Sequence, residues 1–234
     1  VSVRWAGNHW CLAVEAHQFN HPDAIHVCQD LRQADWGAIP PYDLLLAAPA
    51  CQGHSTASQP KRRLYHDALR ATAWVVDCAD FTSPRAIIVE NVPAFLRWRL
   101  YPVWKKALEA LGYHIQEVEL LATDHGVPQR RRRVFVVATR KKVRLEIPRA
   151  AGPEPAFGPC IDWKDGRWRQ VKDAGVQARS RIACGRKRHG RRFVIQHVTG
   201  HCGLPLTDAV RTITTQDQWA VVDGARYRPF TVRE

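Results

Sequence analysis

The chain has 234 residues, 45% of them hydrophobic, which suits one well-packed domain or one domain with a small appendage. It has no run of about 18 apolar residues, and no secretory signal opens it, so we expect neither a membrane span nor a secreted protein. The seven cysteines are odd in number and scattered. This pattern is unlike a secreted disulfide framework and predicts a reducing compartment.

Charge is unevenly distributed along the chain. Residues 1–139 carry 15 basic and 13 acidic side chains, whereas residues 140–234 carry 20 and 9. A strongly basic segment attracts polyanions over a long range. Two basic clusters are interleaved with aromatic residues, which favours nucleic acid over a merely solvated surface. The residues are Arg186, Lys187, Arg188, Arg191 and Arg192 among Trp163, Trp168 and Phe193.

The first 140 residues alternate short apolar runs with amphipathic stretches, a pattern typical of βαβ units with a parallel sheet. We predict strands at residues 1–6, 25–27, 42–48, 86–90, 115–121 and 134–139. We predict helices at 10–19, at 63–80 and from Pro93 to near Gly112, with a loop over 49–60. Residues 145–205 are rich in Gly, Pro, Arg and Trp and predict a smaller irregular domain. Short apolar runs return at 206–234.

Three unusually polar segments adjoin predicted strands, at residues 49–55, 90–93 and 126–133. Because ligands of open α/β sheets bind outside the carboxyl ends of the strands, we expect these loops to converge. Each has an ordinary interpretation by itself. A single Cys is usually a small buried residue, a Glu at a strand end is commonly solvated, and an arginine run is usually a basic surface. Their joint appearance indicates an active site.

Four segments resemble motifs of the DNA (cytosine-5)-methyltransferase family. They are ACQGHS (nucleophile loop), ENVPAFL (ENV motif), GVPQRRRRVFVVA (QxRxR motif) and RTITTQDQW with the following ARYRPFTVRE. The resemblance covers nearly the whole chain except residues 145–205. It implies an α/β, Rossmann-like, S-adenosylmethionine-dependent methyltransferase fold. Residues 1–144 and 206–234 would form the catalytic domain, and residues 145–205 a small irregular target-recognition region.

The resemblance implies methyl transfer from S-adenosylmethionine to carbon 5 of cytosine in double-stranded DNA, with Cys51 as the nucleophile. The residue type fits, because a thiolate can add to carbon 6 and make carbon 5 nucleophilic. Glu90 would hold ring nitrogen 3 and the amino group. Arg131 and Arg133 would contact the base oxygen and orient Glu90. The target cytosine must leave the duplex to reach these groups.

The resemblance also implies binding residues. On the cofactor side, Trp10 would face the adenine, His9 would stand at the ribose position, and Asp30 with Leu31 would read the adenine amino group. Pro49 would line the pocket. Phosphate and base contacts would come from the loop after the nucleophile and from the basic segment. These DNA-binding residues are Gln52, Ser55, Arg62, Arg63, Arg186, Lys187 and Arg188.

The sequence departs from the family pattern at several points. The F-x-G-x-G loop that normally opens the family, and the strand before it, are absent, and so is the closing motif after Glu234. His9 replaces an acidic residue, Ala50 a proline, and His54 an aromatic residue. We expect a truncated, split or degenerate enzyme, with a second chain as one source of the missing cofactor loop and a monomer otherwise. The expected location is the cytoplasm or nucleoid of a prokaryote or phage-infected host.

Alternatives remain open at this point. A non-catalytic DNA-binding remnant or subunit would also lack the glycine loop, and a tRNA cytosine methyltransferase can share the Cys51, ENV and QxRxR motifs. Five residues could supply zinc ligands, but their spacing fits no CxxC-type site and we expect no metal. They are Cys184, His189, His197, His201 and Cys202.

Overall fold

The computed structural model describes residues 2–50, 65–198, 200–213 and 219–231, and the side chains of residues 65–71 are outside this description. The chain forms two compact units. Unit 1 comprises residues 1–120 and 132–146, and unit 2 comprises residues 121–131 and 147–234. The helices in the described part are too short or too polar to cross a membrane.

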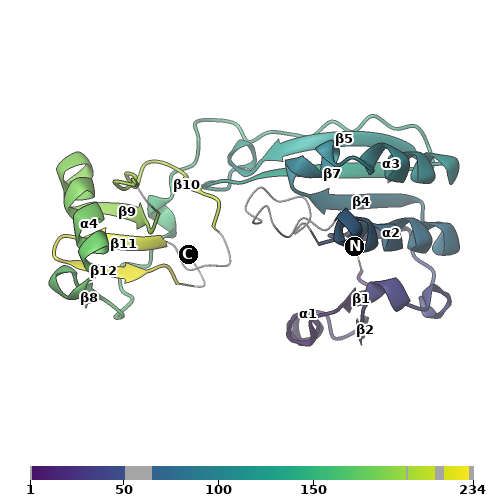
Figure 1. Cartoon of the computed structure of the whole chain (residues 1–234), viewed down its shortest axis with the longest axis horizontal. Coiled ribbons are helices and arrows are strands. Elements are labelled where there is room, and N and C mark those ends of the chain that lie inside the picture. Colours follow the sequence, from purple (N-terminus) through teal and green to yellow (C-terminus); the bar gives the residue numbers. More distant parts are fainter. Residues whose placement is uncertain (1, 51–64, 199, 214–218, 232–234) are drawn as a thin grey trace. The chain divides into compact units, whose positions relative to one another are not determined.

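The centre of unit 1 is a four-stranded sheet with the strand order β3-β4-β7-β5 (Figure 1). β3 is parallel to β4, but β4 is antiparallel to β7, so the expectation of a parallel sheet is wrong for β7. The connection from β5 to β7 holds just the 3-10 turn η5 (Ala122–His125) and the short β6 (Gln129–Arg130). A parallel return requires a longer crossover, usually a helix. The four strands are β3 (Leu44–Ala47), β4 (Ala86–Asn91), β5 (His114–Leu121) and β7 (Arg132–Thr139).

The core of unit 1 lies between this sheet and two helices, α2 (Tyr65–Thr82) and α3 (Tyr101–Ala110). Ile87 and Val89 of β4 are buried, and so are Val134 and Val136 of β7. Their period of two places the apolar side chains on one face of each strand. Packing of this buried face fixes the positions of β4 and β7, and therefore also the backbone positions of the residues at the ends of these strands.

The single helix predicted from Pro93 to Gly112 is wrong. The segment forms a 3-10 helix, η4 (Pro93–Arg97), and then the separate helix α3. Pro102 lies in the first turn of α3, where its missing N–H costs nothing. Inside a longer helix the proline ring would clash with the carbonyl four residues earlier, so a new helix begins here.

A second, two-stranded parallel sheet consists of β1 (Trp5–Asn8) and β2 (Ile25–Cys28), connected by helix α1 (Cys11–Asn20). None of the described residues of α1 is buried. A two-stranded sheet with so little burial is marginal in water. The Cys11–Cys28 disulfide joins the start of α1 to the end of β2 and closes this segment covalently.

Among the described residues four cysteines are paired, although their scattered positions in the sequence did not suggest a disulfide framework. Besides Cys11–Cys28, a disulfide joins Cys184 to Cys202, and the Cα atoms of each pair are 5.2 Å apart. Cys78 and Cys160 are free. Sequence spacing could not identify the pairs, because the partners meet through folding of the intervening segments.

Trp36 connects the β1–β2 sheet to α2. It belongs to the short 3-10 helix η2 (Trp36–Ala38) and is 5% exposed. Its Nε1 donates to Oδ2 of Asp77 at 2.7 Å. Its ring stacks on Trp74 at 6.1 Å and meets Trp5 edge-on at 6.4 Å between centroids. This indole therefore packs against both β1 and α2.

Unit 2 contains a four-stranded antiparallel sheet with the order β8-β12-β11-β9. Helix α4 (Val176–His189) packs on β9 (Figure 1). Phe193 and Ile195 of β9 are buried on the face that also buries Ile182 of α4, and Val194 is buried in the cluster on the other face. The strands are β8 (Arg169–Gln170), β9 (Arg192–Gln196), β11 (Trp219–Asp223) and β12 (Arg226–Pro229).

The compact units do not follow the predicted functional division. β10 (Val210–Arg211) pairs with β6, and β11 and β12 pair with β9 and β8, so residues 206–234 fold with unit 2. The region at 145–205 contains regular elements, including α4 and β9. The assignment of catalytic and target-recognition roles to these segments stays a prediction.

Replacing both Cys11 and Cys28 by serine should selectively loosen the β1–α1–β2 segment. In the chain-entropy model, closing a loop of this length contributes roughly 3 kcal/mol, and α1 has no buried side chain to offset its loss. We expect the amides of α1 to exchange about tenfold faster or more in hydrogen–deuterium exchange, while those of β4 and β7 stay protected.

The matched control is the double replacement of Cys184 and Cys202 by serine. The two disulfides have sequence separations of 17 and 18 residues, but the control lies in unit 2. It should leave α1 unchanged. Equal protection of α1 in the wild type and in the Cys11/Cys28 variant would contradict the role of this disulfide.

Candidate active site

The entry to the nucleophile loop is tied to the end of β4. Pro49 is buried, and its carbonyl oxygen accepts a hydrogen bond from Nδ2 of Asn91 at 3.2 Å. Asn91 is 1% exposed, and its Oδ1 accepts from the backbone N–H of Val92 at 2.8 Å. One buried amide therefore fixes the positions of two chain segments. The predicted residues Cys51, Gln52, Ser55, Arg62 and Arg63 lie outside the described residues.

Glu90 and Arg133 form an ion pair at the end of β4. The Nε of Arg133 lies 2.8 Å from Oε1 of Glu90, and the side chains are 20% and 34% exposed respectively. Because β4 and β7 run antiparallel, the last residues of β4 lie beside the first residues of β7. The structure thus brings together two of the four predicted catalytic residues. A charge-assisted hydrogen bond to a guanidinium restrains the direction of the carboxylate.

The neighbouring arginines have other partners. Arg130 pairs with Glu154, where the Nη2–Oε2 distance is 2.6 Å, and Nη1 of Arg132 lies 2.8 Å from Oε1 of Glu119. Arg131 is half-buried, and its backbone carbonyl accepts from the N–H of Ala122 at 2.9 Å. Arg131 belongs to unit 2, whereas Glu90 and Arg133 belong to unit 1. The four consecutive arginines are therefore not equivalent.

On the predicted cofactor side, the ends of β1 and β2 are bonded to each other. The N–H of Gln29 donates to the carbonyl of Asn8 at 3.0 Å, and Asn8 Oδ1 accepts from the N–H of Trp10 at 2.9 Å. Trp10 precedes α1 and is 61% exposed, and His9 is exposed beside it. The indole is accessible to a flat ring.

The carboxylate of Asp30 is already occupied by an arginine. Its Oδ1 accepts from the backbone N–H of Arg32 at 3.0 Å and from Nε of the same residue at 2.9 Å, and Oδ2 also contacts Nη2. The side-chain hydrogen bond from Arg32, followed by the backbone one, lowers the pKa of Asp30 to about 2. Asp30 is thus a fixed, ionised acceptor at the end of β2, and sequence reasoning missed its partner.

Leu31 approaches β1 closely. A Cβ atom added at Gly7 would lie 2.9 Å from Cδ2 of Leu31 and 2.2 Å from the ring of Trp5. Glycine is therefore needed at position 7 for the η1 turn (Leu31–Gln33) to pack against β1.

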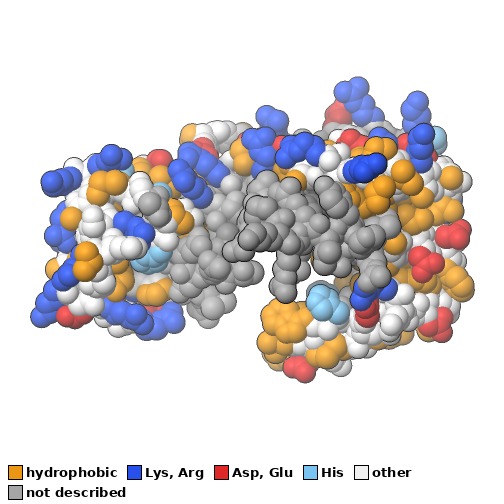
Figure 2. All heavy atoms as spheres, viewed as in Figure 1, with side chains coloured by type: hydrophobic (Ala, Val, Ile, Leu, Met, Phe, Trp, Pro, Cys, Tyr) orange, Lys and Arg blue, Asp and Glu red, His pale blue; other side chains and the backbone are white. Residues whose placement is uncertain are grey.

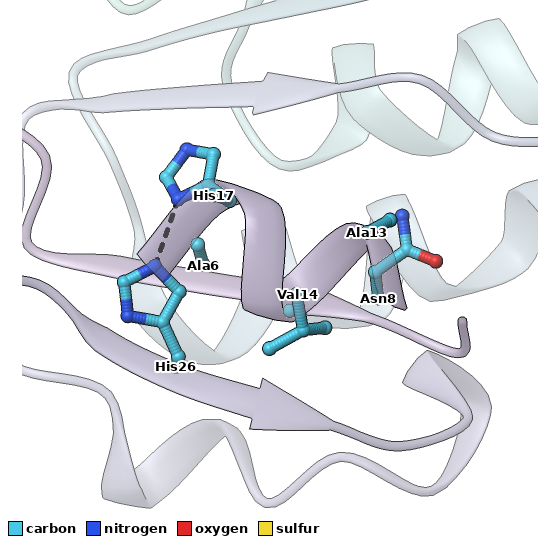
Figure 3. A pocket seen from close by; sticks show the side chains of 7 residues that line it. Ala6, Asn8, Ala13, Val14, His17 and His26 are labelled. Atoms are coloured by element: carbon cyan, nitrogen blue, oxygen red, sulfur yellow. Dashed lines mark hydrogen bonds between the residues drawn. The ribbon is translucent and has the colours of Figure 1, made fainter. Parts of the chain in front are cut away.

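A small pocket lies between α1 and the β1–β2 sheet (Figure 3). Ala6, Ala13 and Val14 line it, and the rings of His17 and His26 point toward one another, with 2.8 Å between Nδ1 and Nε2. Burial, followed by the neighbouring His21 and His26, lowers the pKa of His17.

The predicted DNA contacts Arg186, Lys187 and Arg188 form the last turn of α4 and are exposed. Positive charge at a helix C-terminus is favourable, because carbonyl groups gather there. Figure 2 shows Lys and Arg side chains spread over the unit that contains α4.

Three of the five candidate zinc ligands are engaged in other interactions. Cys184 and Cys202 form a disulfide, and Nδ1 of His201 accepts from the backbone N–H groups of Gln196 and Gly203 at 3.1 and 3.3 Å. Within the described ranges, no three His, Cys, Asp or Glu side chains are placed to hold a metal ion.

Asn91 and Arg32 are the two residues of this region that sequence reasoning missed. The Asn of the ENV segment was a usable signal, because an Asn beside an active-site Glu at a buried strand end needs hydrogen-bond partners. The Asp-x-Arg spacing of Asp30 and Arg32 was a second signal, since such a pair can close a local turn.

Comparisons with known proteins agree with the sequence motifs. The family model described as C-5 cytosine-specific DNA methylase matches residues 1–173. The Type II methyltransferase M.AgeI of Thalassovita gelatinovora is 31% identical over 160 residues, which cover 63% of this chain and 36% of that protein. M.NgoBV of Neisseria gonorrhoeae is 30% identical over 162 residues, covering 64% and 37%. The match therefore spans little more than a third of these relatives.

A solved methyltransferase of Entamoeba histolytica is similar in fold, with a TM-score of 0.53 and 18% identity. The similarity covers 68% of this chain and 51% of that one. It confirms the predicted methyltransferase fold class.

Replacing Asn91 by alanine should lower the free energy of unfolding by about 1–3 kcal/mol, because the buried Pro49 carbonyl loses its donor. Chemical denaturation followed by circular dichroism measures this loss. Asn20→Ala is the matched control, since Asn20 makes a similar amide-to-carbonyl bond to Ala16 at 2.8 Å but at an exposed site. A change within about 0.5 kcal/mol is expected there. Equal effects of the two replacements would contradict the bracing role of Asn91.

Replacing Arg32 by glutamine should raise the pKa of Asp30 from about 2 toward its ordinary value, so that the carboxyl is protonated at a higher pH. Carbon-13 NMR titration of the carboxyl group measures the shift. Arg167→Gln is the control, because Arg167 forms the same Asp-x-Arg pair with Asp165, whose pKa is also about 2. This control should raise the pKa of Asp165 and leave the pKa of Asp30 unchanged. An unchanged Asp30 titration in the Arg32 variant would show that Arg32 does not hold this carboxylate.

Proposed function

The chain belongs to the C-5 cytosine-specific DNA methylase family, and on that premise we propose that it catalyses methyl transfer to carbon 5 of cytosine in double-stranded DNA. The observation that carries the proposal is the ion pair of Glu90 and Arg133 at the end of β4, directly beside the Asn91 bond to Pro49. Glu90 and Asn91 are consecutive in the chain, and we infer that the oriented carboxylate acts together with the loop that follows Pro49.

Cys51 is proposed as the nucleophile. Its thiolate adds to carbon 6 of cytosine, so that an S–C bond forms and the electron pair of the 5,6 double bond moves to carbon 5. Carbon 5 then takes the methyl group. A base removes the proton from carbon 5, the double bond re-forms, and the S–C bond breaks to release the thiolate.

Glu90 is proposed to hold the cytosine edge during this addition. One oxygen of the carboxyl group accepts a hydrogen bond from the exocyclic amino group. The other oxygen, when protonated, donates to ring nitrogen 3 as electron density builds up in the ring. Arg133 keeps Glu90 in one orientation through the 2.8 Å contact. Arg131 is proposed to contact the base oxygen. Because these groups act on the ring edge, the cytosine must be flipped out of the duplex.

The residues at the ends of β1 and β2 fit S-adenosylmethionine as the methyl donor. Trp10 offers an exposed aromatic face, and Asp30, held ionised by Arg32, is proposed as an acceptor that the adenine amino group would share with Arg32. These are the chemistries that an adenine ring and its amino group require. His9, Leu31 and Pro49 would complete this side. When bound, the cofactor supplies the activated methyl group.

We propose that a further strand completes the cofactor side. In the part that the structure describes, β1 pairs with β2 alone and β3 pairs with β4 alone. Leu46 of β3 is 66% exposed and Ile25 of β2 is 51% exposed, although strands of parallel sheets are normally buried on both faces. A glycine-rich loop with its strand, from a second chain or from another part of a longer one, would cover such edges.

Target recognition is proposed for residues 145–205, and catalysis for residues 1–144 and 206–234. Gln52 and Ser55 would contact the DNA around the flipped nucleotide. Phosphate contacts would come from Arg62, Arg63 and the basic last turn of α4. The curated relatives are called Type II methyltransferases, and we propose the same restriction–modification setting for this chain.

Covalent trapping tests the reaction. The chain is incubated with S-adenosylmethionine and duplex DNA containing 5-fluorocytosine, with and without an added N-terminal segment that carries the glycine-rich loop. Because fluorine at carbon 5 cannot leave as a proton does, we expect a denaturation-resistant adduct that Cys51→Ser abolishes. No adduct from a folded, DNA-binding and cofactor-binding protein would favour a non-catalytic subunit. An adduct with RNA but not with DNA would reassign the substrate.

The same assay tests whether Glu90 takes part in the reaction or is a carboxylate with a structural role alone. Glu90→Gln should slow adduct formation by roughly 10²–10³-fold. Glu119→Gln is the matched control, because Glu119 forms an ion pair of equal length, 2.8 Å, with Arg132 in the same sheet. It should leave the rate nearly unchanged. Equal rates for the two variants would remove Glu90 from the proposed chemistry.

A further inference from the structure

Three arginines of unit 2 converge on one buried carboxylate. Asp223 ends β11, and its side chain is 0% exposed. Its Oδ1 lies 2.8 Å from Nε of Arg191 and 3.4 Å from Nε of Arg192, and its Oδ2 lies 2.9 Å from Nη2 of Arg226. β11 runs antiparallel to both neighbours, so its last residue lies opposite the first residues of β9 and β12. We refer to these three residues, Arg191, Arg192 and Arg226, as the arginine cluster.

The arginine cluster holds more positive charge than Asp223 can balance. One carboxylate faces three guanidinium groups, whose side chains are 74%, 50% and 45% exposed. Burial by itself would raise the pKa of Asp223, but the hydrogen bonds from Arg226, Arg191 and Arg192 outweigh it and lower the pKa to about 2. The carboxylate is therefore ionised at neutral pH. It restrains all three arginines from their buried side, while the rest of each side chain is exposed to solvent.

Two of the arginines are also restrained by aromatic rings. The guanidinium carbon of Arg192 lies 4.4 Å from the ring centroid of Trp163, and that of Arg226 lies 4.6 Å from that of Trp168. The two indoles stack on each other at 6.2 Å with 12° between their planes. A guanidinium that is already oriented loses less side-chain entropy when it binds an anion. The cluster is thus preorganised.

The cluster adjoins the basic end of α4. Nη2 of Arg186 donates to the carbonyl of Gly224, the residue after Asp223, at 2.6 Å. This bond joins the last turn of α4 to the turn between β11 and β12. Arg186, which the sequence identified as a basic site, and the arginine cluster therefore belong to one basic surface built from separate segments.

We propose that the arginine cluster binds backbone phosphates of duplex DNA. Arginine forks match phosphate oxygens in pairs, and phosphate contacts set the position of a protein on DNA without reading its sequence. The inference rests on the proposed function, because it takes DNA as the substrate. It assigns the backbone contacts of that DNA to residues other than Glu90 and Arg133. The cluster acts in binding and takes no part in the transfer.

The test measures binding of a short fluorescent duplex without S-adenosylmethionine, by anisotropy at several salt concentrations. Each phosphate contact contributes roughly 0.9 to the slope of log K against log salt. Arg191→Ala should therefore reduce the slope by about 1, and the Arg191/Arg226 double alanine variant by about 2, equally for unrelated sequences. Arg191 is the most exposed member, so its single replacement leaves the other two bonds to Asp223 intact.

Arg167→Ala is the matched control. Arg167 also lies in unit 2, is 71% exposed and pairs with Asp165 at 2.8 Å. Its slope should equal that of the wild type. Unchanged slopes in folded Arg191 and double variants would overturn the proposal, and so would an equal loss in the Arg167 variant. Because no methyl transfer is involved, the 5-fluorocytosine assay reports separately on the proposed function.

Discussion

β4 and β7 pair antiparallel over six residues, and their buried aliphatic faces hold this pairing rigidly. Glu90 and Asn91 end β4, while Arg133 lies at the beginning of β7. The carboxylate–guanidinium contact of 2.8 Å depends on this register, whereas the Asn91 bond to Pro49 depends on the parallel pairing of β4 with β3. A shift by one residue would turn Glu90 toward the opposite face of the sheet. The geometry of the candidate site is thus a consequence of core packing.

The β1–α1–β2 segment is built on a different physical basis. Its helix buries no described side chain, and its sheet has two strands. The Cys11–Cys28 disulfide and the contacts of Trp36 replace the missing core. The residues proposed for adenosine recognition, Trp10 and Asp30, lie next to the two ends of that disulfide. The part of unit 1 proposed to bind the cofactor is therefore the part with the least burial.

In unit 2 a buried carboxylate organises a group of arginines, whereas in unit 1 apolar packing fixes the pairing of β4 with β7. Asp223 is buried at a point where three strands meet, and it organises arginines from both sides. A buried carboxylate requires partners, and here the partners carry more charge than it needs. The excess is available at the surface. Unit 2 combines this charge with the stacked indoles of Trp163 and Trp168.

The sequence by itself determined the family and the order of the main elements, and it predicted the residues of the candidate site. It did so because hydrophobic periodicity and short motifs are local properties, as in the strand predicted at 86–90 and the ENV segment at its end. The tertiary structure decided which of these residues meet. The antiparallel direction of β7, the contact of Glu90 with Arg133 and the arginine cluster around Asp223 depend on strand register between distant segments. The two disulfides depend on the same long-range geometry, which no local pattern encodes.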